Sequence, residues 1–471
     1  MGAGGSSFFT LPDSMLNNLA DQKKRLIVIG GGAAGFFCAV NAARLDPQLQ
    51  VIILEKSSKL LSKVKVSGGG RCNVTHACFD IAEMMKKYPR GANFVKKTFH
   101  WFFTTDTINW FKERQVELKT EADGRIFPVT NSSQTIIDCL MREANKYKVE
   151  IMMNTEVKSV RRAKRETSDL RPGTPGAGGL NSDAGSQKPE APADQQGGKF
   201  ILEIVSTANR ASDISHQTSD FVCIASGGYP KSSMFDWLQQ TGHSVEAPVP
   251  SLFTFNMPGN TITQLMGISV ENAKVKIAGT KLETNGPLLI THWGLSGPAI
   301  LKLSAWGARQ LAATGYAFTA IVNWLPAYNE HTIRKEFEGF RLNLAAQKMI
   351  NKNPFGLPLR LWEYFLQQCT IAEDTRWAGL PSVLQNKLIK MLCAHECPVK
   401  GKTTFKEEFV TAGGIRLNEV NAHTMMSKLV PNLFFAGEIL DVDGVTGGFN
   451  FQHAWTSGWI AAKSIAAAGG E

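Results

Sequence analysis

The sequence lacks the features that would place the protein in a membrane or outside the cell. No uncharged apolar run reaches the ~18 residues that a membrane-spanning helix needs, so we expect no span. No basic stretch near the start leads into an apolar one, so we expect no secretory signal. The 8 cysteines among 471 residues are few and irregularly spaced, which indicates reduced thiols in a cytoplasmic protein rather than a disulfide framework.

The sequence also has little that would hold a metal ion. Cys393, His395 and Cys397 stand close together, but no second pair of ligands accompanies them, so we expect ordinary helix residues here. Asp441 and Asp443 alone supply too few carboxylates for a cation site. We therefore predict no bound metal.

Acidic residues are fewer than basic ones, and this imbalance bears on which binding partners the protein could have. The formal net charge is +10, which favours polyanionic partners or substrates that carry phosphate. Lysine and arginine gather in 56–65 and 86–97. No RNA-binding motif accompanies them, and such clusters also occur on ordinary solvated surfaces. The charge alone therefore does not assign a nucleic-acid function.

A βαβ unit is present near the start of the chain. Residues 25–29 and 51–54 are short apolar runs rich in β-branched side chains, which predict two buried strands. The stretch 36–45 between them has the composition of a helix. Strand, helix and strand in this order predict a parallel sheet and the α/β class.

A glycine motif lies between the first strand and the helix. Gly30, Gly32 and Gly35 have the G-x-G-x-x-G spacing, which allows a tight turn, approach of a pyrophosphate and close packing of helix on strand. The start of the helix offers unpaired N–H groups to the phosphates. Glu55 ends the second strand, where a carboxylate accepts hydrogen bonds from ribose hydroxyls. The sequence therefore predicts a bound dinucleotide, FAD or NAD.

Three further glycine-rich segments are candidates for the same ligand. Residues 67–73 allow close approach of a flat or charged group, although a surface loop would also explain their composition. Residues 226–228 follow an apolar strand at 221–225, whose end would lie near the cofactor crevice. Residues 436–452 follow another strand and begin a long helix, whose N-terminus we expect to face the flavin ring.

The remaining segments differ in composition. Residues 1–24 indicate a disordered leader and 166–198 a disordered insert that replaces a hairpin turn, because both contain few large apolar residues. Residues 245–323 contain short β-like runs with glycine and proline breaks, and 331–397 have helical spacing. Strand-like sequence returns at 403–410.

With these motifs, the chain resembles the BaiN/RdsA family of FAD-dependent oxidoreductases, also called HI0933-like flavoproteins. The resemblance rests on the segments 29–35, 67–73, 225–230, 291–298, 411–414 and 436–458. It covers most of the chain apart from the leader, the insert and much of the helical region. The long insert is a departure from the compact family pattern.

The resemblance implies an α/β fold with a discontinuous Rossmann-like FAD-binding domain and two insertions. We expect the FAD-binding domain over 25–244 and 416–471, a β-barrel-like domain over 245–330 with return strands over 398–415, and a helical domain over 331–397.

The resemblance also implies the cofactors. They are FAD and, as electron donor, NADPH or NADH, although no second nucleotide fingerprint is visible. The residues expected to bind FAD are Gly30, Gly32, Ala33, Ala34, Gly35, Glu55, Lys56, Ser67, Gly68, Gly69, Gly70, Arg71, Cys72, Asn73, Ser226, Gly227, Gly437, Glu438, Asp441, Thr446, Gly447, Gly448, Phe449 and Asn450.

Members of the family are associated with dihydrouridine formation in ribosomal RNA and with reduction of unsaturated bile-acid intermediates. Both reactions add hydride to an electron-poor carbon, which is C6 in uridine, and need an acid to protonate the neighbouring carbon. Cys72 is the first candidate for this acid because it lies beside Arg71 in a glycine loop, and His292 and His453 are alternatives. Each of the three is also explained as a structural side chain. Arg71 and Asn73 are expected to orient the substrate or the flavin.

Three functions remain open. The first is reduction of uridine to dihydrouridine in large-subunit ribosomal RNA, which the basic balance favours. The second is reduction of a small hydrophobic enone such as a steroid, which needs an apolar pocket. The third is a non-catalytic flavoprotein that binds a partner. Salt-dependent RNA binding separates the first from the second, and bleaching of the flavin by NADPH separates both from the third.

Overall fold

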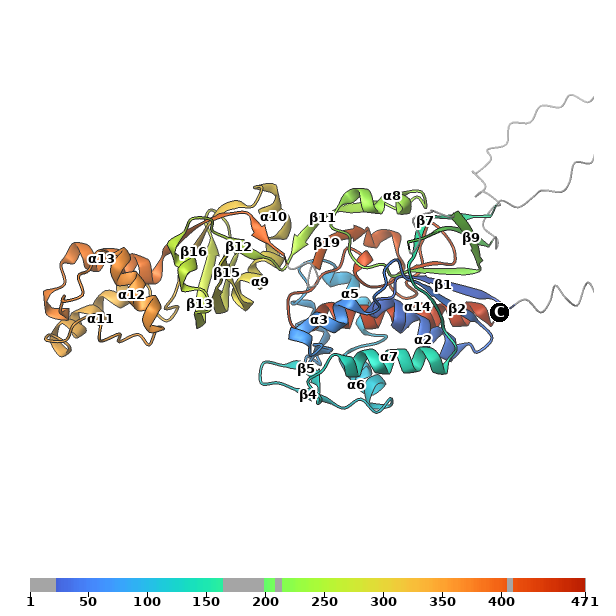
Figure 1. Ribbon diagram of the computed structural model, residues 1–471, viewed down its shortest axis with the longest axis horizontal. Helices are drawn as coiled ribbons and strands as arrows, with labels where there is room; N and C mark the ends of the chain where they lie inside the picture. Colours follow the sequence, from blue (N-terminus) through green and yellow to red (C-terminus); the bar gives the residue numbers. More distant parts are fainter. Residues whose placement is uncertain (1–22, 164–198, 208–213, 405–409, 471) are drawn as a thin grey trace, which may run out of the picture.

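The computed structural model describes residues 23–163, 199–207, 214–404 and 410–470. The predicted insert 166–198 and all but two residues of the predicted leader lie outside these ranges. The molecule is elongated, with a large α/β part, a β-sheet part and a helical part following one another along its longest axis (Figure 1).

A five-stranded parallel sheet is the centre of the α/β part. Its order is β20-β10-β1-β2-β6, and each neighbouring pair is parallel. Four of these strands are mainly apolar and mostly buried, as expected of a parallel sheet covered on both faces, whereas the edge strand β6 is partly exposed. The strands are β1 (Arg25–Ile29), β2 (Gln50–Leu54), β6 (Glu150–Met152), β10 (Phe221–Ile224) and β20 (Leu433–Phe435). Because β20 comes from the end of the chain, this domain is discontinuous in sequence.

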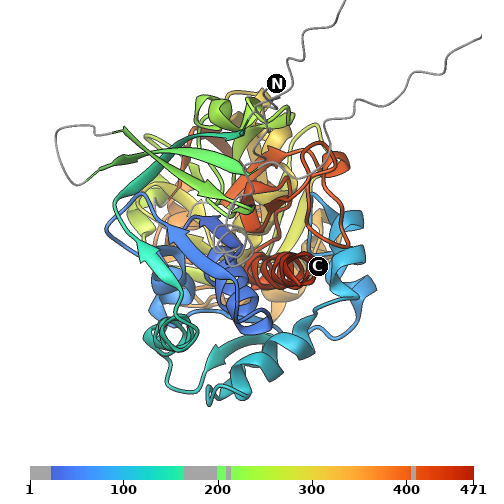
Figure 2. The same ribbon diagram turned by 90° about the vertical axis from the view of Figure 1, so that its right-hand side faces the viewer.

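Helices and small strands surround this sheet. Helix α2 (Ala33–Leu45) joins β1 to β2 and lies beside the C-terminal helix α14 (Phe449–Gly469) (Figure 2). Both helices are largely buried, so they form the inner layer on one face. The other elements here are α3 (Ser62–Gly70), β3 (Thr75–His76), α4 (Ile81–Met85), α5 (Ala92–Phe99), α6 (Thr104–Lys112), β4 (Leu118–Thr120), β5 (Arg125–Pro128) and α7 (Gln134–Lys146).

An antiparallel three-stranded sheet flanks the predicted insert. It consists of β7 (Thr155–Arg162), β8 (Phe200–Ser206) and β9 (Ile214–Ser219). Arg162 is paired with Phe200, so the two strands on either side of the insert are direct partners, and the predicted hairpin pairing of these flanks is confirmed. A short 3-10 turn (Ser232–Phe235) and α8 (Asp236–Gln239) follow β10.

A two-stranded antiparallel ribbon connects the α/β part to the sheet beyond it. Strand β11 (Val245–Ser251) carries the chain out, and β19 (Val410–Ile415) carries it back. The sheet beyond it has seven antiparallel strands in the order β17-β16-β13-β14-β15-β12-β18, and contacts between β12 and β17 curl it towards a barrel. Its strands are β12 (Thr254–Asn256), β13 (Ser269–Ile277), β14 (Glu283–Ile290), β15 (Gly294–Ser296), β16 (Ala317–Asn323), β17 (His395–Lys400) and β18 (Lys402–Thr403).

The sequence pattern missed two helices in this region. We expected only short β runs over 245–323, but α9 (Pro298–Trp306) and α10 (Ala308–Ala313) lie between β15 and β16. Helix α9 begins with Gly297 in the left-handed region and Pro298 at its first turn, a common helix start. A buried apolar face packs α9 onto β14, and this tertiary contact decides the structure.

The helical part also ends earlier than expected. Helices α11 (Glu330–Asn343), α12 (Leu359–Gln368) and α13 (Ser382–Cys393) are confirmed, but the predicted helix residues at 395–397 form the start of β17. His395 and Cys397 are buried while Glu396 is exposed, which is the two-residue period of a strand. Pairing of β17 with β16 therefore overrides the helical spacing.

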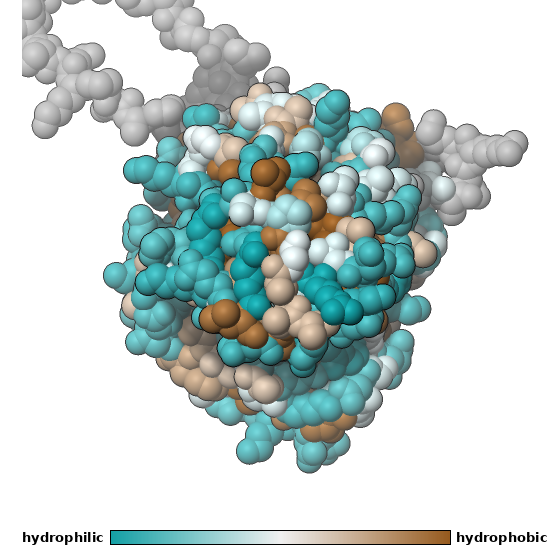
Figure 3. Space-filling model, turned by 90° about the vertical axis from the view of Figure 1, so that its left-hand side faces the viewer, coloured by the Kyte–Doolittle hydropathy of each residue, from teal (hydrophilic) through white to brown (hydrophobic). Residues whose placement is uncertain are grey.

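The helices and the seven-stranded sheet share one hydrophobic core. Trp324 at the end of β16 packs on Phe365 of α12, with ring centroids 5.7 Å apart. The outer end of the helical part is mainly hydrophilic with scattered apolar residues (Figure 3). Within the described ranges, no helix is both long and apolar enough to cross a membrane.

Candidate active site

The first glycine turn is closed by backbone contacts that exclude other residues. Gly30 has φ +113°, and a Cβ there would lie 2.4 Å from the carbonyl oxygen of Ala225 on the neighbouring strand. A Cβ on Gly35 would lie 2.0 Å from the carbonyl oxygen of Gly30. These contacts hold α2 tightly against β1, with its N-terminus at the carboxyl edge of the sheet.

Open space lies in front of this helix N-terminus. Gly32 is its N-cap, has no side-chain cap, and has no atom within 4 Å of the position that a Cβ would take. Ala33 and Ala34 form the first turn. The free N–H groups and the helix dipole therefore face room for a phosphate.

Glu55 borders the same turn. Its Oε2 accepts a hydrogen bond from the Gly31 N–H at 2.8 Å, and its Oε1 accepts from the Ser57 hydroxyl at 2.8 Å. The carboxylate is thus fixed at the carboxyl end of β2, where a ribose would lie. Lys56 is exposed, with Nζ 5.5 Å from the centre of the Tyr229 ring.

The loop 67–73 is held in a left-handed conformation. Helix α3 breaks at Ser67, and Gly68, Gly69 and Gly70 have φ of +59°, +69° and +82°. No atoms lie within 4 Å of the Cβ positions of Gly69 and Gly70, so the backbone here is open to a flat ligand. The Arg71 guanidinium points instead to the β4–β5 hairpin.

Arg71 is fixed there by two partners. Its Nη1 lies 2.5 Å from Glu121 Oε1, and its guanidinium lies 4.0 Å from the centre of the Phe127 ring. The orienting role that we expected for Arg71 remains a prediction, because both contacts are to the β4–β5 hairpin.

Asn73 joins the loop 67–73 to the C-terminal glycine turn. In the amide orientation that satisfies its neighbours, Asn73 donates to the Thr75 carbonyl at 2.9 Å and accepts from the Gly448 N–H at 3.0 Å. Asn73 is 7% exposed, so these bonds are shielded from water. Two segments more than 370 residues apart in sequence are thereby brought together.

The C-terminal glycine turn leads directly into α14. The Asn450 side chain donates to the Gly444 carbonyl and accepts from the Gly444 N–H, which closes the turn that contains Thr446 and Gly447. Gly448 is the N-cap, with φ +92° and no side-chain cap of its own. Phe449 is buried at the first helical position. The result is a second helix N-terminus at the carboxyl edge of the sheet.

The two helix N-termini are offset along one direction. A Cβ on Gly458 of α14 would lie 2.7 Å from the Ala34 carbonyl at the start of α2, and Gly469 lies beside Asp46 at its end. The helices therefore run parallel. Since α14 starts nine residues before Gly458, it extends about 14 Å beyond the start of α2 at 1.5 Å per residue. An extended dinucleotide with phosphates at one terminus and a ring at the other fits this offset.

Three acidic residues of the C-terminal segment anchor the other elements. Glu438 accepts from the Thr411 N–H at 2.8 Å and pairs with Lys63 at 2.5 Å. Asp441 pairs with Arg309 of α10 at 2.9 Å. FAD contacts that we predicted for Glu438 and Asp441 remain predictions, because both carboxylates already have partners in the protein.

Asp443 is the most deeply buried of these carboxylates. It is 0% exposed, pairs with Arg90 and accepts from the Ser251 hydroxyl at 2.9 Å. Burial raises its pKa, and the Arg90 guanidinium opposes that rise. The ion pair ties the C-terminal segment to β11, the strand that leads out of the α/β part. No cluster that could hold a metal occurs among the described residues.

The segment 226–228 lies between these elements. Gly227 has φ +77° with open space at its Cβ position. A Cβ on Gly228 would lie 2.6 Å from the Thr411 hydroxyl and 2.8 Å from Glu438. Ser226 is half-buried beside them. Gly228 therefore allows the end of β10 to approach the linking strand β19.

Cys72 is sealed in the core. It is 0% exposed in a left-handed conformation with φ +60°, and burial raises the pKa of its thiol to about 12. The thiol therefore stays protonated and is a weak acid. The role that we predicted for Cys72 remains a prediction.

The two histidines that the sequence suggested lie apart from each other. His292 is exposed in the turn between β14 and β15, with its ring 4.7 Å from that of Trp293. The Trp293 carbonyl accepts from the Met257 N–H, just before a second 3-10 turn (Thr261–Leu265) that contacts α12 through Thr261. This places His292 towards the helical part, away from the loop 67–73.

His453 is enclosed in α14. Its Nε2 lies 3.3 Å from the Gly437 carbonyl, its Nδ1 is buried without a partner, and Gly437 in turn touches Ala34. Burial lowers the pKa of His453 to about 4. The imidazole is therefore neutral near pH 7 and holds no proton to donate there.

A pH dependence of stability follows from this burial. The folded pKa of His453 lies about 2.5 units below the unfolded value of 6.5, so its contribution is full above pH 6.5 and is lost as the pH falls towards 4. The expected loss is about 3 kcal/mol. Urea denaturation of wild type and His453→Leu between pH 4 and 7 measures it. Burial also lowers the pKa of His395 to about 4, so this residue makes the free energy of unfolding depend on pH in the same way. The variant should therefore keep about half of the wild-type dependence on pH. An unchanged slope would show that His453 is already protonated in the fold.

His76 is the site residue that sequence reasoning missed. Its Nδ1 lies 3.1 Å from the Gly447 carbonyl, so this nitrogen carries a hydrogen, and its ring lies 4.7 Å from that of Phe449. It is half-buried in β3, next to the turn that precedes α14. Only its position four residues after Cys72 hinted at this, since no motif includes it.

Charges around His76 are mainly positive. Burial lowers its pKa, and Lys87 and Lys302 lower it further, while the Gly447 carbonyl and Asp123 oppose them. Lys302 belongs to α9, so the sheet part contributes to the positive charge around His76.

These features together define the class of the protein. Two uncapped helix N-termini at one sheet edge, three open glycine segments and the Glu55 carboxylate fit the phosphates, ring and ribose of one FAD molecule. The protein is an FAD-dependent oxidoreductase.

Comparisons with known proteins give the family. The family model of the HI0933-like protein Rossmann domain matches residues 24–174, and that of the HI0933-like protein barrel and H2TH domain matches residues 249–410. Together they cover more than half of the chain. The chain belongs to the HI0933-like family, and the predicted fold class is confirmed.

Three curated relatives match along almost their whole length. A ribosomal RNA dihydrouridine synthase of Escherichia coli is 29% identical over 440 residues, which cover 93% of this chain and 96% of that protein. The protein of the same name from Haemophilus influenzae is 27% identical, with 92% and 96% covered. A 3-dehydro-bile acid delta(4,6)-reductase of Clostridium scindens is 26% identical, with 94% and 99% covered.

Proposed function

We propose that this protein reduces uridine to dihydrouridine in large-subunit ribosomal RNA, with electrons from NADPH or NADH. The relatives of this name and the bile-acid reductase are similarly distant in sequence, so identity alone does not choose between their substrates. The observation that carries the proposal is the excess of positive charge around His76, to which Lys87 and Lys302 contribute, beside the start of α14. Cations around His76 suit the phosphates of a polynucleotide, whereas a steroid has no phosphate group for them to bind.

The residues of the chain supply binding and protonation in this proposal. The glycine turn at Gly32 and the N-terminus of α14 hold FAD, which supplies hydride to the electron-poor carbon when it is bound and reduced. Lys87 and Lys302 hold the phosphates that flank the target uridine. His76 protonates the neighbouring carbon through Nε2, because its Nδ1 hydrogen is engaged by the Gly447 carbonyl.

His76 suits this proton transfer better than the candidates from sequence. The pKa of Cys72 is raised to about 12 and that of His453 is lowered to about 4, and both side chains are fully buried. His76 is half-exposed, and its pKa is lowered from 6.5. An acid with a pKa near the working pH transfers protons most efficiently.

We expect His76→Gln to retain FAD but to lower turnover about 100-fold. Since protonated His76 is the active form, wild-type activity should fall as the pH rises through the lowered pKa, and the variant should lose this dependence. FAD absorbance and a pH–rate profile measure both effects. Cys72→Ala is the control and should keep most of the activity. Loss of turnover in Cys72→Ala with an unaffected His76→Gln would return the role to Cys72.

A second candidate function is reduction of a small enone. It is favoured by the bile-acid reductase that matches 94% of this chain. Purified, FAD-loaded protein should be bleached anaerobically by NADPH or NADH and reoxidised by ribosomal RNA in a salt-sensitive manner. Reoxidation by a steroid enone but not by RNA would favour the second function. Failure of both nucleotides to bleach the flavin would leave a non-catalytic flavoprotein.

The cysteines bear on where this reaction takes place. All eight lie in the described residues and none is in a disulfide. This suits the reducing cytoplasm, which we propose as the location.

A further inference from the structure

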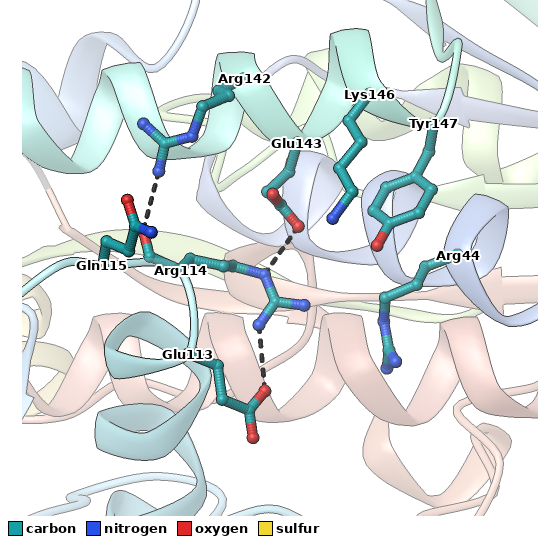
Figure 4. A pocket seen from close by; sticks show the side chains of 8 residues that line it. All are labelled: Arg44, Glu113, Arg114, Gln115, Arg142, Glu143, Lys146 and Tyr147. Atoms are coloured by element: carbon teal, nitrogen blue, oxygen red, sulfur yellow. Dashed lines mark hydrogen bonds and ion pairs between the residues drawn. The ribbon is translucent and has the colours of Figure 1, made fainter.

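A basic cavity lies far from the glycine turns. It has a volume of about 420 Å³ and lies among α2, α7 and the chain that follows α6 (Figure 4). Four basic side chains, Arg44, Arg114, Arg142 and Lys146, and two glutamates, Glu113 and Glu143, line it. We refer to it as the α2–α7 cavity.

This cavity belongs to the opposite edge of the central sheet. Arg44 is in the last turn of α2 and Lys146 in the last turn of α7. Since α2 begins at the glycine turn, Arg44 lies about 17 Å along the helix from the predicted phosphate position. The α2–α7 cavity is therefore separate from the FAD site.

The carboxylates of the cavity are already occupied by one arginine. Arg114 Nε lies 2.8 Å from Glu143 and its Nη1 lies 3.3 Å from Glu113. The Arg114 guanidinium also lies 3.9 Å from the centre of the Trp110 ring. Both acids therefore pair with Arg114 on one side of the cavity, as the dashed lines of Figure 4 show.

The other three cations have no carboxylate partner in the part of the chain that the structure describes. Arg142 donates to the neutral Arg114 carbonyl at 2.8 Å, and Lys146 Nζ lies 5.0 Å from the centre of the Tyr147 ring. The Nε of Arg44 is buried and makes no hydrogen bond. Four positive and two negative groups leave an excess of two positive charges.

Helix dipoles do not account for this arrangement. The carbonyl ends of α2 and α7 favour cations such as Arg44 and Lys146 nearby. That effect needs no cavity, however, and it leaves the buried Arg44 Nε unsatisfied. A buried donor without an acceptor is unfavourable, so the Arg44 side chain favours a ligand that brings acceptor atoms to it.

We propose that the α2–α7 cavity binds the phosphate group of an organic phosphate. Guanidinium groups match the planar pairs of phosphate oxygens, and a charge of two on a phosphate balances the excess. The volume is in the range of small-molecule sites. The Tyr147 ring lines the cavity beside Arg44 and offers a flat surface for a base (Figure 4). A free nucleotide with a terminal phosphate presents this charge on one group, whereas an RNA strand presents one charge on each of its successive phosphates.

The test uses full-length, FAD-loaded protein and two probes, adenosine 5′-monophosphate and a single-stranded 12-nucleotide RNA. We expect Arg44→Gln and Lys146→Gln each to weaken binding of at least one probe about tenfold. Lys112→Gln, an exposed lysine on α6 outside the cavity, should bind like wild type. Calorimetric titration measures the affinities, and unchanged melting temperatures show that the variants are folded.

The two probes distinguish the sources of the phosphate. A loss restricted to the mononucleotide identifies a free nucleotide, and a loss restricted to the RNA identifies a strand contact. Equal affinities for Arg44→Gln, Lys146→Gln and Lys112→Gln with both probes would overturn the proposal. The readout is binding at a site distant from the flavin, so this failure would leave the proposed reductase activity untouched.

Discussion

Gly35→Ala is expected to abolish FAD binding and to lower the melting temperature of the protein. A Cβ at this position would lie 2.0 Å from the Gly30 carbonyl oxygen, which is backbone and cannot rotate away. Helix α2 would have to move off β1, and its N-terminus would no longer meet the pyrophosphate. The ratio of flavin to protein absorbance after purification measures the loss, and thermal denaturation measures the stability. We expect at least a tenfold lower FAD content, because the phosphates lose several charge-assisted hydrogen bonds.

Gly32→Ala is the matched control. It adds the same methyl group to the same turn, but no atom lies within 4 Å of its Cβ position and Gly32 has an ordinary negative φ of −93°. The apoprotein should therefore keep its melting temperature, while FAD binds more weakly because the methyl group occupies the room for the phosphate. Normal FAD content in Gly35→Ala would contradict the close packing of α2 on β1.

Arg90→Ala is expected to reduce the free energy of unfolding by about 3–5 kcal/mol at pH 7, since it leaves a buried carboxylate without its partner. Asp443 is fully buried, and burial already raises its pKa even with Arg90 present. In the variant, Asp443 gains a proton at higher pH. A carboxyl whose pKa is raised by folding stabilises the folded protein at low pH, and this contribution is lost as the pH rises. The loss in free energy of unfolding caused by Arg90→Ala should therefore be smaller at pH 5 than at pH 7.

Arg309→Ala provides the comparison for this ion pair. Arg309 pairs with Asp441 in the same segment, but its side chain is 46% exposed, so the loss should stay below about 1 kcal/mol. Urea denaturation of both variants at pH 5 and 7 gives the comparison. Similar small losses for both would mean that the Arg90–Asp443 pair does not hold β11 to the C-terminal segment.

Local patterns predicted the parts of the fold that depend on nearby residues. The strand at 25–29, the glycine turn and the helix after it follow from periodicity and glycine spacing, and the structure confirms these elements. The hairpin pairing across the insert was predicted from two alternating flanks. The residue types of these elements follow local rules, so the sequence pattern is enough to predict them.

The elements that the pattern missed depend on contacts with distant segments. The start of β17 has helical spacing, but Cys397 is buried by pairing with β16 more than 70 residues earlier. Glu438 and Asp441 likewise pair with side chains of other elements, Lys63 and Arg309, while their predicted FAD contacts remain predictions. No single-sequence pattern contains such partners.

His76 shows the same limit at the site. Its neighbours in sequence give no reason to choose it, and its importance arises because Gly447 and Phe449 meet it in space. The bond between Asn73 and Gly448 creates that meeting. Chemistry that combines the two ends of the chain therefore becomes visible only in the folded protein.

The proposed substrate of this oxidoreductase is uridine in large-subunit ribosomal RNA. Mass spectrometry of nucleosides from that RNA, with the gene present and deleted, shows whether this is so. We expect dihydrouridine to disappear in the deletion, to return with the wild-type gene and to stay scarce with His76→Gln. Dihydrouridine that is unchanged by the deletion, or absent in both strains, would rule out this substrate and make small enones the substrates to test.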